Sequence, residues 1–547
     1  MDLTTDFLIV GCGPAGASLA CFLGSHGLTG IVIGAASGTA DTPRAHITNM
    51  AALECLRDIG LEREVERVAS RSGCMEHTRW CYSMAGVEFA RVYAWGHDPR
   101  RMGDYALASP CTPADVPQTL LEPILIRYAT QHGFHVRFDT KLTAIDIQDE
   151  TIQATVLDTL SHSRYRIQAR YLLAADGARS LVVRELDLPL RKRPGQGTAY
   201  NVLVRADMEH LVRARSGNLH WVVRPDVEGG VFAAVGIVRM VRTWDEWIFI
   251  LFPGREGVDP SEEQCWRRVR LLIGDETPFE VVGVSKWQIN HVVAESFCLG
   301  DAVHRHPPMN GLGSNTCIQD AYNLAWKLAL VHKGQAGHSL LETYDAERQP
   351  VGVEVVSRAN QAFKDHARLW AALGVTSTEG DGARALQELV EVGERGERRR
   401  RELRLGVEET TAEFHGLGVE MGQRYCSEAI FDADEPEPWK AKGRAAEDPV
   451  RYYEPGTYPG SRLPHAWLNK AIPAKATSTL DVAGHGRFVL LTGVGGSAWK
   501  TEAEKVSATL GVEMEAVSIG FRQDWEDVYF EWERVRGVGR GGCVGQA

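Results

Sequence analysis

Two glycine-rich segments follow apolar runs and carry residue types that suit dinucleotide binding. In the first, the apolar run 7–10 leads into a G-x-G-x-x-G pattern, in which Gly11, Gly13, Ala15 and Gly16 are candidate cofactor-binding residues. The first glycine of such a turn allows the tight bend, the second lets the backbone approach a pyrophosphate, and the third lets the helix pack on the sheet. One pattern of this kind is weak evidence when it stands alone.

The second segment joins an acidic residue, two prolines and a glycine-rich turn. Asp301 follows the apolar run 297–299, which suits a buried strand, and it can accept hydrogen bonds from a sugar hydroxyl. Pro307 and Pro308 hold one wall of the loop in a fixed conformation. A helical pattern starts after the turn, so free backbone N–H groups would face a bound anion. The candidate cofactor-binding residues of this turn are Gly311, Gly313, Ser314 and Asn315. A tight strand-to-helix turn without a ligand explains the segment equally well.

A third apolar run, 171–175, ends in Asp176 and Gly177, with Arg179 shortly after. The three segments in this order resemble the flavoprotein aromatic hydroxylases that have a single FAD domain. The local sequences that carry the resemblance are GDAVHRHPP, GLGSN and IQDAYNLAWKLAL. These motifs are most similar to those of the 2,4-dichlorophenol 6-monooxygenase branch of the phenol hydroxylase family. The resemblance is looser in the last third of the chain. In that family the Asp-Gly loop serves both FAD and the pyridine nucleotide.

The resemblance implies an α/β fold with a Rossmann-like FAD-binding domain and an inserted antiparallel-sheet substrate domain, as in p-hydroxybenzoate hydroxylase. We place the FAD-binding domain at residues 1–395 and the insertion at about 190–292. A helical segment and a linker rich in proline and glycine follow at 396–465. The insertion has its own signal, because short apolar runs alternate with turn residues there, which is typical of an antiparallel sheet.

The resemblance also implies a thioredoxin-like C-terminal domain at residues 466–547. Residues 478–520 have the pattern of a strand, a loop, a helix and a second strand. No C-x-x-C occurs, which excludes thiol redox activity of that form. Relatives continue through a further hairpin, so we expect this domain to be truncated.

Other stretches must form the elements that hold the site. Residues 51–69 have the spacing of one amphipathic helix, and residues 72–105 look irregular. Within the expected sheet we place one strand at 231–235. The charged stretch 380–413 predicts a solvent-exposed helix face with i,i+4 ion pairs and not a ligand site.

Several site residues come from the resemblance alone. Arg44 would contact FAD phosphate or the nicotinamide cofactor, while His46 and Asn49 would lie near the flavin ring or the substrate. Gln118 would hydrogen-bond the ribose-pyrophosphate region of FAD. Without the family, plain packing or solvent exposure explains each of these residues. The expected substrate wall consists of Trp221, Trp247, Trp287 and Pro307.

The chain departs from the dinucleotide-binding pattern at the end of its second strand. A carboxylate for the adenosine ribose usually stands there, but this chain has Gly34 followed by two alanines. The next acidic residue, Asp41, is too far along the loop to substitute. We therefore expect weaker FAD binding or a water molecule in place of the side chain.

The implied reaction is hydroxylation of a phenolic ring by O2 through a flavin C4a-hydroperoxide, with NADPH or NADH as hydride donor. The chamber must exclude water so that the peroxide does not collapse to H2O2. Deprotonating a phenol, whose pKa is about 10, makes the ring more nucleophilic, so a base helps. His46 and His291 are the catalytic candidates for that role, while His304 and His306 stay open. Pro308 would line the peroxide site through its carbonyl.

The composition excludes several other classes of protein. The 547-residue chain is 44% hydrophobic and 24% charged, which is typical of a soluble protein with two or three domains. A net charge of −12 argues against a nucleic-acid partner, and no run approaches the ~18 apolar residues of a membrane span. The 11 cysteines show no metal-ligand spacing, so we expect neither metal nor disulfide in a reducing, cytoplasmic protein. A homodimer is implied by the resemblance alone.

Three alternatives remain open for the sequence. A flavin oxidase or dehydrogenase would use the same FAD motifs without hydroxylating a substrate. A hydroxylase of a polyketide or other secondary metabolite would run the same chemistry in a larger chamber. A non-catalytic binding protein that keeps the flavin fold is suggested by Gly34.

Overall fold

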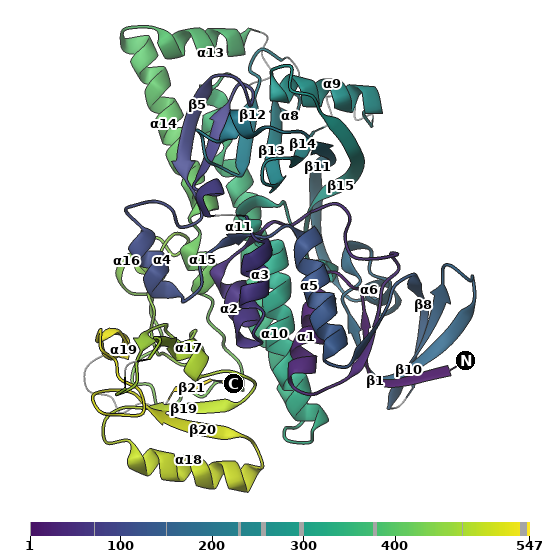
Figure 1. The fold of residues 1–547 in the computed structure, drawn as a ribbon, viewed down its shortest axis with the longest axis vertical. Coiled ribbons are helices and arrows are strands. Elements are labelled where there is room, and N and C mark those ends of the chain that lie inside the picture. Colours follow the sequence, from purple (N-terminus) through teal and green to yellow (C-terminus); the bar gives the residue numbers. More distant parts are fainter. Residues whose placement is uncertain are drawn as a thin grey trace.

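Two large sheets are joined by long helices, and a smaller α/β unit follows them in the chain (Figure 1). The computed structural model describes residues 2–70, 72–148, 150–227, 231–252, 259–294, 300–375, 380–472, 474–536 and 544–546. The predicted strand at 297–299 lies outside these residues. Among the helices that the structure describes, none is long and apolar enough to cross a membrane.

The first sheet has six strands and carries the glycine turn that follows its central strand β1. Four strands are parallel, as in a dinucleotide-binding fold, and two antiparallel strands extend one edge. In spatial order the strands are β7 (Phe134–Arg137), β2 (Gly30–Ile33), β1 (Asp2–Val10), β10 (Arg164–Ala174), β9 (Thr151–Asp158) and β8 (Thr140–Gln148). The helices that share its main apolar core are α1 (Pro14–Ser25), α5 (Gln118–Gln131) and α10 (Gly313–His332).

The second sheet has eight strands and presents two apolar faces. In spatial order the strands are β16 (His304–Arg305), β15 (Glu280–Ala294), β11 (Leu190–Arg205), β14 (Glu246–Leu251), β13 (Val235–Arg242), β12 (Leu219–Val223), β4 (His77–Cys81) and β5 (Glu88–Tyr93). One face packs on α9 (Glu262–Ile273). The other face meets α11 (Ser339–Asp365), α12 (Ala367–Ala372) and α14 (Glu394–Phe414). Residues that are far apart in sequence therefore lie next to one another on this second face.

Residues 72–105 are more regular than the sequence predicts. They form β4, β5 and α4 (Met102–Ala108), and β4 runs parallel to β12. The pairing partner of β4 lies more than a hundred residues away, so no local pattern announces it. The eight-stranded sheet consequently includes strands from before the expected insertion as well as from within it.

Two predicted elements are wrong in detail. The helix expected at 51–69 is split into α2 (Met50–Asp58) and α3 (Glu62–Val68), because Gly60 between them adopts a left-handed conformation with φ of 80°. The strand expected at 231–235 begins only at Val235, after the single helical turn α8 (Val231–Ala234). The first error is a break inside the expected helix, and the second concerns the start of a strand, where local sequence preference is weak.

The C-terminal unit contains the predicted strand, helix and strand. These are β19 (Phe488–Thr492), α18 (Ser497–Leu510) and β20 (Met514–Ser518), with β19 parallel to β20 and antiparallel to β21 (Val544–Gln546). The thioredoxin-like assignment stays a prediction.

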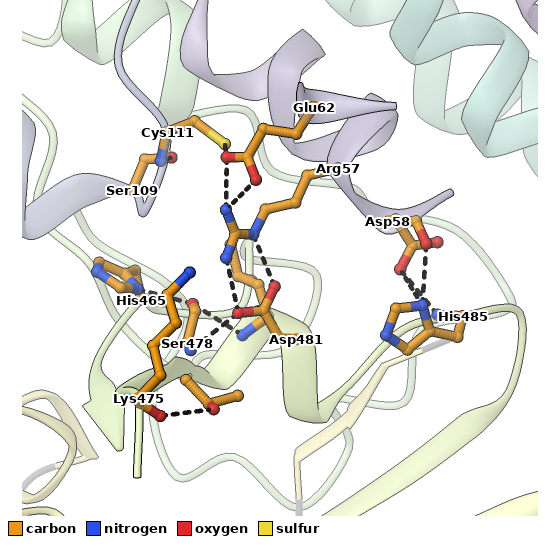
Figure 2. Close-up of polar contacts among 12 residues, drawn as sticks. Arg57, Asp58, Glu62, Ser109, Cys111, His465, Lys475, Ser478, Asp481 and His485 are labelled. Atoms are coloured by element: carbon orange, nitrogen blue, oxygen red, sulfur yellow. Dashed lines mark hydrogen bonds and ion pairs between the residues drawn. The ribbon is translucent and has the colours of Figure 1, made fainter. Parts of the chain in front are cut away.

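Ion pairs fasten this unit to α2 (Figure 2). Arg57 donates to both carboxylate oxygens of Asp481, at 2.6 and 2.9 Å, and also pairs with Glu62. Beside it, Asp58 accepts a hydrogen bond from the backbone N–H of His485 at 2.8 Å. Because α2 begins directly after the loop at 41–49, the C-terminal unit braces the helix that follows a candidate cofactor loop.

Candidate functional site

The N-terminal glycine turn is close-packed at two glycines and open at the third. A Cβ atom on Gly11 would lie 2.1 Å from the Ala175 carbonyl oxygen, and one on Gly16 would lie 2.0 Å from the Gly11 carbonyl oxygen. A Cβ atom on Gly13 would have no neighbour closer than 4.0 Å. Helix α1 starts next to Gly13 with no side-chain cap and no acidic residue in its first turn. Its free N–H groups therefore border an open cradle that suits a pyrophosphate.

A carboxyl group that the sequence reasoning missed lies beside this cradle. Glu122 is buried and accepts hydrogen bonds from the Ala40 backbone N–H and from Gln118 Nε2, both at 2.6 Å. Its burial raises its pKa, while Gln118, Ala40 and the nearby Arg44 act in the opposite direction. The i,i+4 spacing of Gln118 and Glu122 on the amphipathic helix α5 was the signal that could have revealed it. The predicted Gln118 thus contacts this acidic group, and the exposed Arg44 is close enough to lower its pKa.

The missing ribose carboxylate has a structural explanation. A Cβ atom on Gly34 would lie 2.7 Å from Cys12 Sγ, so the thiol fills the space that a longer side chain would take. Burial raises the pKa of Cys12 to about 12, which keeps it a neutral thiol. The usual carboxylate is therefore absent because the Cys12 side chain, from the neighbouring loop, occupies the space beside Gly34.

The two other glycine loops contribute an unpaired acceptor and a second free helix end. Asp176 Oδ2 accepts a hydrogen bond from the Leu181 backbone at 2.7 Å, whereas Asp176 Oδ1 is buried without a partner. The loop of Gly177 contacts the turn that carries the exposed Asp301. Helix α10 begins at Gly313 with no side-chain cap and no acidic residue in its first turn, and Ser314 is half-buried there. Free N–H groups at this end suit a delocalised anion.

Asn315 has a structural role that the prediction did not include. Its Nδ2 donates to the carbonyl oxygens of Ile47 and Gly311 at 2.8 and 2.6 Å, and its Oδ1 accepts from the Asn49 backbone at 2.9 Å. The amide therefore ties the loop at 41–49 to the start of α10. Gly311 takes the left-handed φ of 63° that this turn requires.

An apolar chamber lies against the turn before α10. The space between its lining residues, counted together with its opening to solvent, is about 300 Å³. The lining residues are Trp221, Ile237, Ile250, Phe252, Trp287, Ile289, Pro307, Pro308, Met309 and Phe363. Four predicted residues, Trp221, Trp287, Pro307 and Pro308, are thus brought together. One lone pair of the Pro308 carbonyl oxygen is engaged by the Gly311 N–H at 3.2 Å.

One predicted substrate residue lies elsewhere, and another caps a helix. Trp247 is fully buried on the opposite face of the sheet, in the core against α9, and its Nε1 donates to the Ala206 carbonyl at 3.1 Å. The reason is strand alternation, because Ile250 and not Trp247 points toward the chamber from β14. Asn49 is the N-cap of α2, where its Oδ1 accepts from the Ala52 N–H at 3.0 Å. The prediction that Trp247 lines the substrate wall is therefore wrong. That Asn49 lies near the flavin ring or the substrate stays a prediction.

A buried cluster of polar groups surrounds His46. Its Nδ1 has no hydrogen-bond partner and lies 3.8 Å from Asp115 Oδ1. Asp115 is fully buried and accepts hydrogen bonds from Asn218 Nδ2 at 2.5 Å and from Arg239 Nη2 at 3.3 Å. Burial and the Arg239 guanidinium hold the pKa of His46 well below its usual range. Its neighbour Ile47 packs in the apolar core that also contains Trp221 and Met309.

The other candidate histidines differ in their surroundings. His304 Nε2 pairs with Asp320 at 2.9 Å, inside a buried network that includes Arg348, so it serves the core. Burial lowers the pKa of His306 to about 4, and its Nδ1 hydrogen-bonds the Pro307 carbonyl at 2.6 Å. His291 is half-buried on β15, on the same strand face as the chamber residue Ile289. Burial, followed by Arg193, lowers its pKa.

Fold and site together define a flavoprotein-type enzyme, with a dinucleotide cradle on one sheet and an apolar chamber under the other. No group of three metal-ligating side chains occurs among the residues that the structure describes.

Comparisons with known proteins agree with this class. Residues 4–359 match the FAD binding domain family, and residues 456–535 match the C-terminal domain of aromatic-ring hydroxylases. The chain is 40% identical to the 2,4-dichlorophenol 6-monooxygenase of Delftia acidovorans, over 99% of this chain and 93% of that relative. It is also 40% identical to the phenol 2-monooxygenase of Pseudomonas sp. (strain EST1001), over 99% of this chain and 88% of that one.

A solved structure gives the same answer. The flavin-dependent monooxygenase PieE in complex with FAD and substrate matches with a TM-score of 0.93 at 35% identity, covering 100% of this chain and 94% of that one. The chain belongs to the family of FAD-dependent aromatic-ring hydroxylases. The predicted fold class, enzyme class and FAD cofactor are thereby confirmed, and the non-catalytic alternative is set aside.

The described residues fit FAD. The open cradle at Gly13, the uncapped start of α1 and the unpaired Oδ1 of Asp176 offer one acceptor and several donors where a dinucleotide lies in this fold. The uncapped start of α10 supplies a second set of free N–H groups. The described atom nearest to a Cβ placed on Gly13 would be Glu122 Oε1, at 4.0 Å, so the cradle is open.

Proposed function

We propose that this enzyme hydroxylates a phenol ring held in the apolar chamber, and that His46 is the base for the phenolic O–H. NADPH or NADH serves as hydride donor, and O2 supplies the inserted oxygen atom. The observation that carries the proposal is the buried His46, whose unpaired Nδ1 lies 3.8 Å from the buried Asp115 carboxylate and whose neighbour Ile47 packs in the same apolar core as chamber residues. Two relatives at 40% identity are named as monooxygenases of phenol and of 2,4-dichlorophenol, which supports a phenolic substrate.

His46 and Asp115 divide the work of activating the ring. Burial lowers the pKa of His46, so its imidazole is neutral near pH 7 and accepts a hydrogen bond from the phenolic hydroxyl. As the proton moves to His46, the Asp115 carboxylate stabilises the imidazolium. Asn218 and Arg239 hold Asp115 in place for this task. Asp115 is therefore a positioning residue that acts through His46.

The remaining parts of the chain bind, orient and exclude water. When bound, FAD supplies the redox chemistry that delivers one oxygen atom from O2 to the ring. The only polar groups on the side chains that line the chamber are the indole N–H groups of Trp221 and Trp287, so the rest of the apolar lining disfavours water beside the reacting ring. Pro307 and Pro308 form the wall nearest the start of α10 and keep its shape fixed.

The test measures phenol turnover and its pH profile. The purified protein with FAD should oxidise NADPH faster when a phenol is added, with little H2O2 released. Asp115→Asn should lower kcat about a hundredfold and shift its pH profile, while FAD affinity stays unchanged. A protein whose NADPH oxidation ends only in H2O2 with every phenol tested would overturn the proposed substrate class. A variant with an unaltered pH profile would overturn the role of Asp115.

A further inference from the structure

Three polar groups behind the chamber have no hydrogen-bond partner. Trp221 Nε1, His366 Nε2 and Glu413 Oε2 are all buried, and the exposed fractions of these residues are 3%, 1% and 6%. Trp221 is part of the chamber wall itself. Buried polar groups are nearly always paired, so three unpaired ones at a single place indicate that a hydrogen-bonding group belongs there.

The three side chains are contiguous. The Trp221 and His366 rings lie 4.6 Å apart between centroids, and His366 Nε2 lies 3.5 Å from Glu413 Oε2. His366 follows the end of α11, three residues after Phe363, which also lines the chamber. Glu413 belongs to the last turn of α14, which the sequence had assigned to an exposed helix face. The group therefore extends from the chamber wall into the protein.

The protonation of the group follows from its contacts. His366 Nδ1 lies 3.1 Å from the Ala362 carbonyl oxygen, which can only accept, so Nδ1 carries the proton and Nε2 is an acceptor. Burial lowers the pKa of His366 to about 4 and raises the pKa of Glu413 to about 8. Near pH 7 Glu413 is therefore a neutral carboxylic acid with one O–H to donate, and the 3.5 Å between its Oε2 and His366 Nε2 is too long for a strong hydrogen bond between the two. Trp221 Nε1–H is a second donor.

We propose that Trp221, His366 and Glu413 form a polar inner subsite, which selects ring substrates that carry a carbonyl oxygen on a substituent. A carbonyl oxygen accepts from both donors, whereas a hydrocarbon substituent leaves them unpaired. The inference rests on the proposed hydroxylation of a phenol in the same chamber and names its substrate class more closely: phenols with a ketone-bearing or amide-bearing side chain.

The test compares two phenols of equal shape, 4-(2-oxopropyl)phenol and 4-isobutylphenol. A methylene group separates the carbonyl from the ring, so the reactivity of the two rings is similar. For each phenol, Kd is measured from the perturbation of the flavin absorption spectrum, and kcat/KM from product formation. The quantity of interest is the Kd of the hydrocarbon divided by the Kd of the ketone, in the wild type and in variants.

Trp221→Phe and Glu413→Leu should each lower this ratio about tenfold, because each removes one donor to the carbonyl. Glu413→Gln keeps an N–H donor and should keep most of the ratio. Trp287→Phe is the matched control, since Trp287 also lines the chamber but its Nε1 already donates to Asn201 at 2.9 Å. This control should change both affinities alike.

An equal ratio in the wild type, Trp221→Phe and Glu413→Leu would overturn the inference and leave the three groups to buried water. If Glu413→Leu fails to fold, Trp221→Phe decides alone, because it keeps an aromatic ring in the chamber wall while removing the indole N–H. Failure of the proposed function looks different: neither phenol would then perturb the flavin spectrum or be hydroxylated.

Discussion

Replacing Gly13 with alanine should separate cofactor binding from folding. Gly13 has an ordinary φ of −74°, and a Cβ atom there would meet nothing closer than 4.0 Å. The substitution therefore leaves the cofactor-free protein unstrained. The added methyl group occupies the cradle at the start of α1, where the pyrophosphate of FAD must approach the backbone.

The size of the effect follows from the contact that is lost. A hydrogen bond to a charged group contributes about 1.5–3 kcal/mol, so losing one backbone N–H contact to phosphate should raise the Kd for FAD about 10- to 150-fold. Gly16→Ala is the matched control. A Cβ atom on Gly16 would lie 2.0 Å from the Gly11 carbonyl oxygen, so this variant should destabilise the cofactor-free protein itself.

The assay combines FAD titration with thermal unfolding. Quenching of FAD fluorescence gives Kd, and the Tm is recorded with and without FAD. Gly13→Ala should keep the Tm of the cofactor-free protein and lose most of the FAD-induced rise, whereas Gly16→Ala should lower the Tm before any FAD is added. Unchanged FAD affinity in Gly13→Ala would refute the placement of the pyrophosphate at this turn.

Three further predictions concern other parts of the molecule. Arg57→Ala breaks the two hydrogen bonds to Asp481 and should speed limited proteolysis of the C-terminal unit; unchanged cleavage would contradict the bracing role. Asn315→Ala leaves three backbone groups unpaired and should lower the Tm and FAD affinity together, so a Tm equal to wild type would contradict it. In the unfolded chain glutamate loses its proton near pH 4.5, whereas in the folded protein the pKa of Glu413 is raised to about 8. Between these values the folded state binds the extra proton, so the free energy of unfolding falls by about 1.4 kcal/mol per pH unit as the pH rises. Glu413→Gln should therefore show a flatter fall in stability from pH 6 to pH 8, and parallel curves for both proteins would contradict the neutral state of Glu413.

The turns that carry the candidate cofactor residues were largely predictable from the sequence. The glycine turn, the Asp-Gly loop and the start of α10 are local patterns, and each reports its conformation through glycine, proline and the period of apolar residues. Gly13 and Asp176 lie where these patterns predict. The C-terminal strand, helix and strand were predictable for the same reason.

The proposed substrate site was not predictable in this way, because its residues meet only through long-range pairing. Asp115 is a single acidic residue in a short strand. Its proposed role depends on hydrogen bonds from Asn218 and Arg239, which lie more than a hundred residues away in sequence. Glu413 ends a helix whose earlier turns are charged and exposed, so its burial depends on the packing of α14 against α11 and α12. The choice of Trp221 over Trp247 depends on which strand face meets the helices, and no single strand reveals that.

The central claim is that an oxygen atom from O2 enters a phenol ring held in the apolar chamber. The most direct measurement is turnover of 4-(2-oxopropyl)phenol with FAD, NADPH and ¹⁸O2, followed by mass spectrometry of the product. The account predicts that about one ¹⁸O atom enters the ring product for each NADPH oxidised. In His46→Ala most NADPH oxidation should no longer lead to hydroxylated product. A product without ¹⁸O, or NADPH oxidation that yields only H2O2, would contradict it.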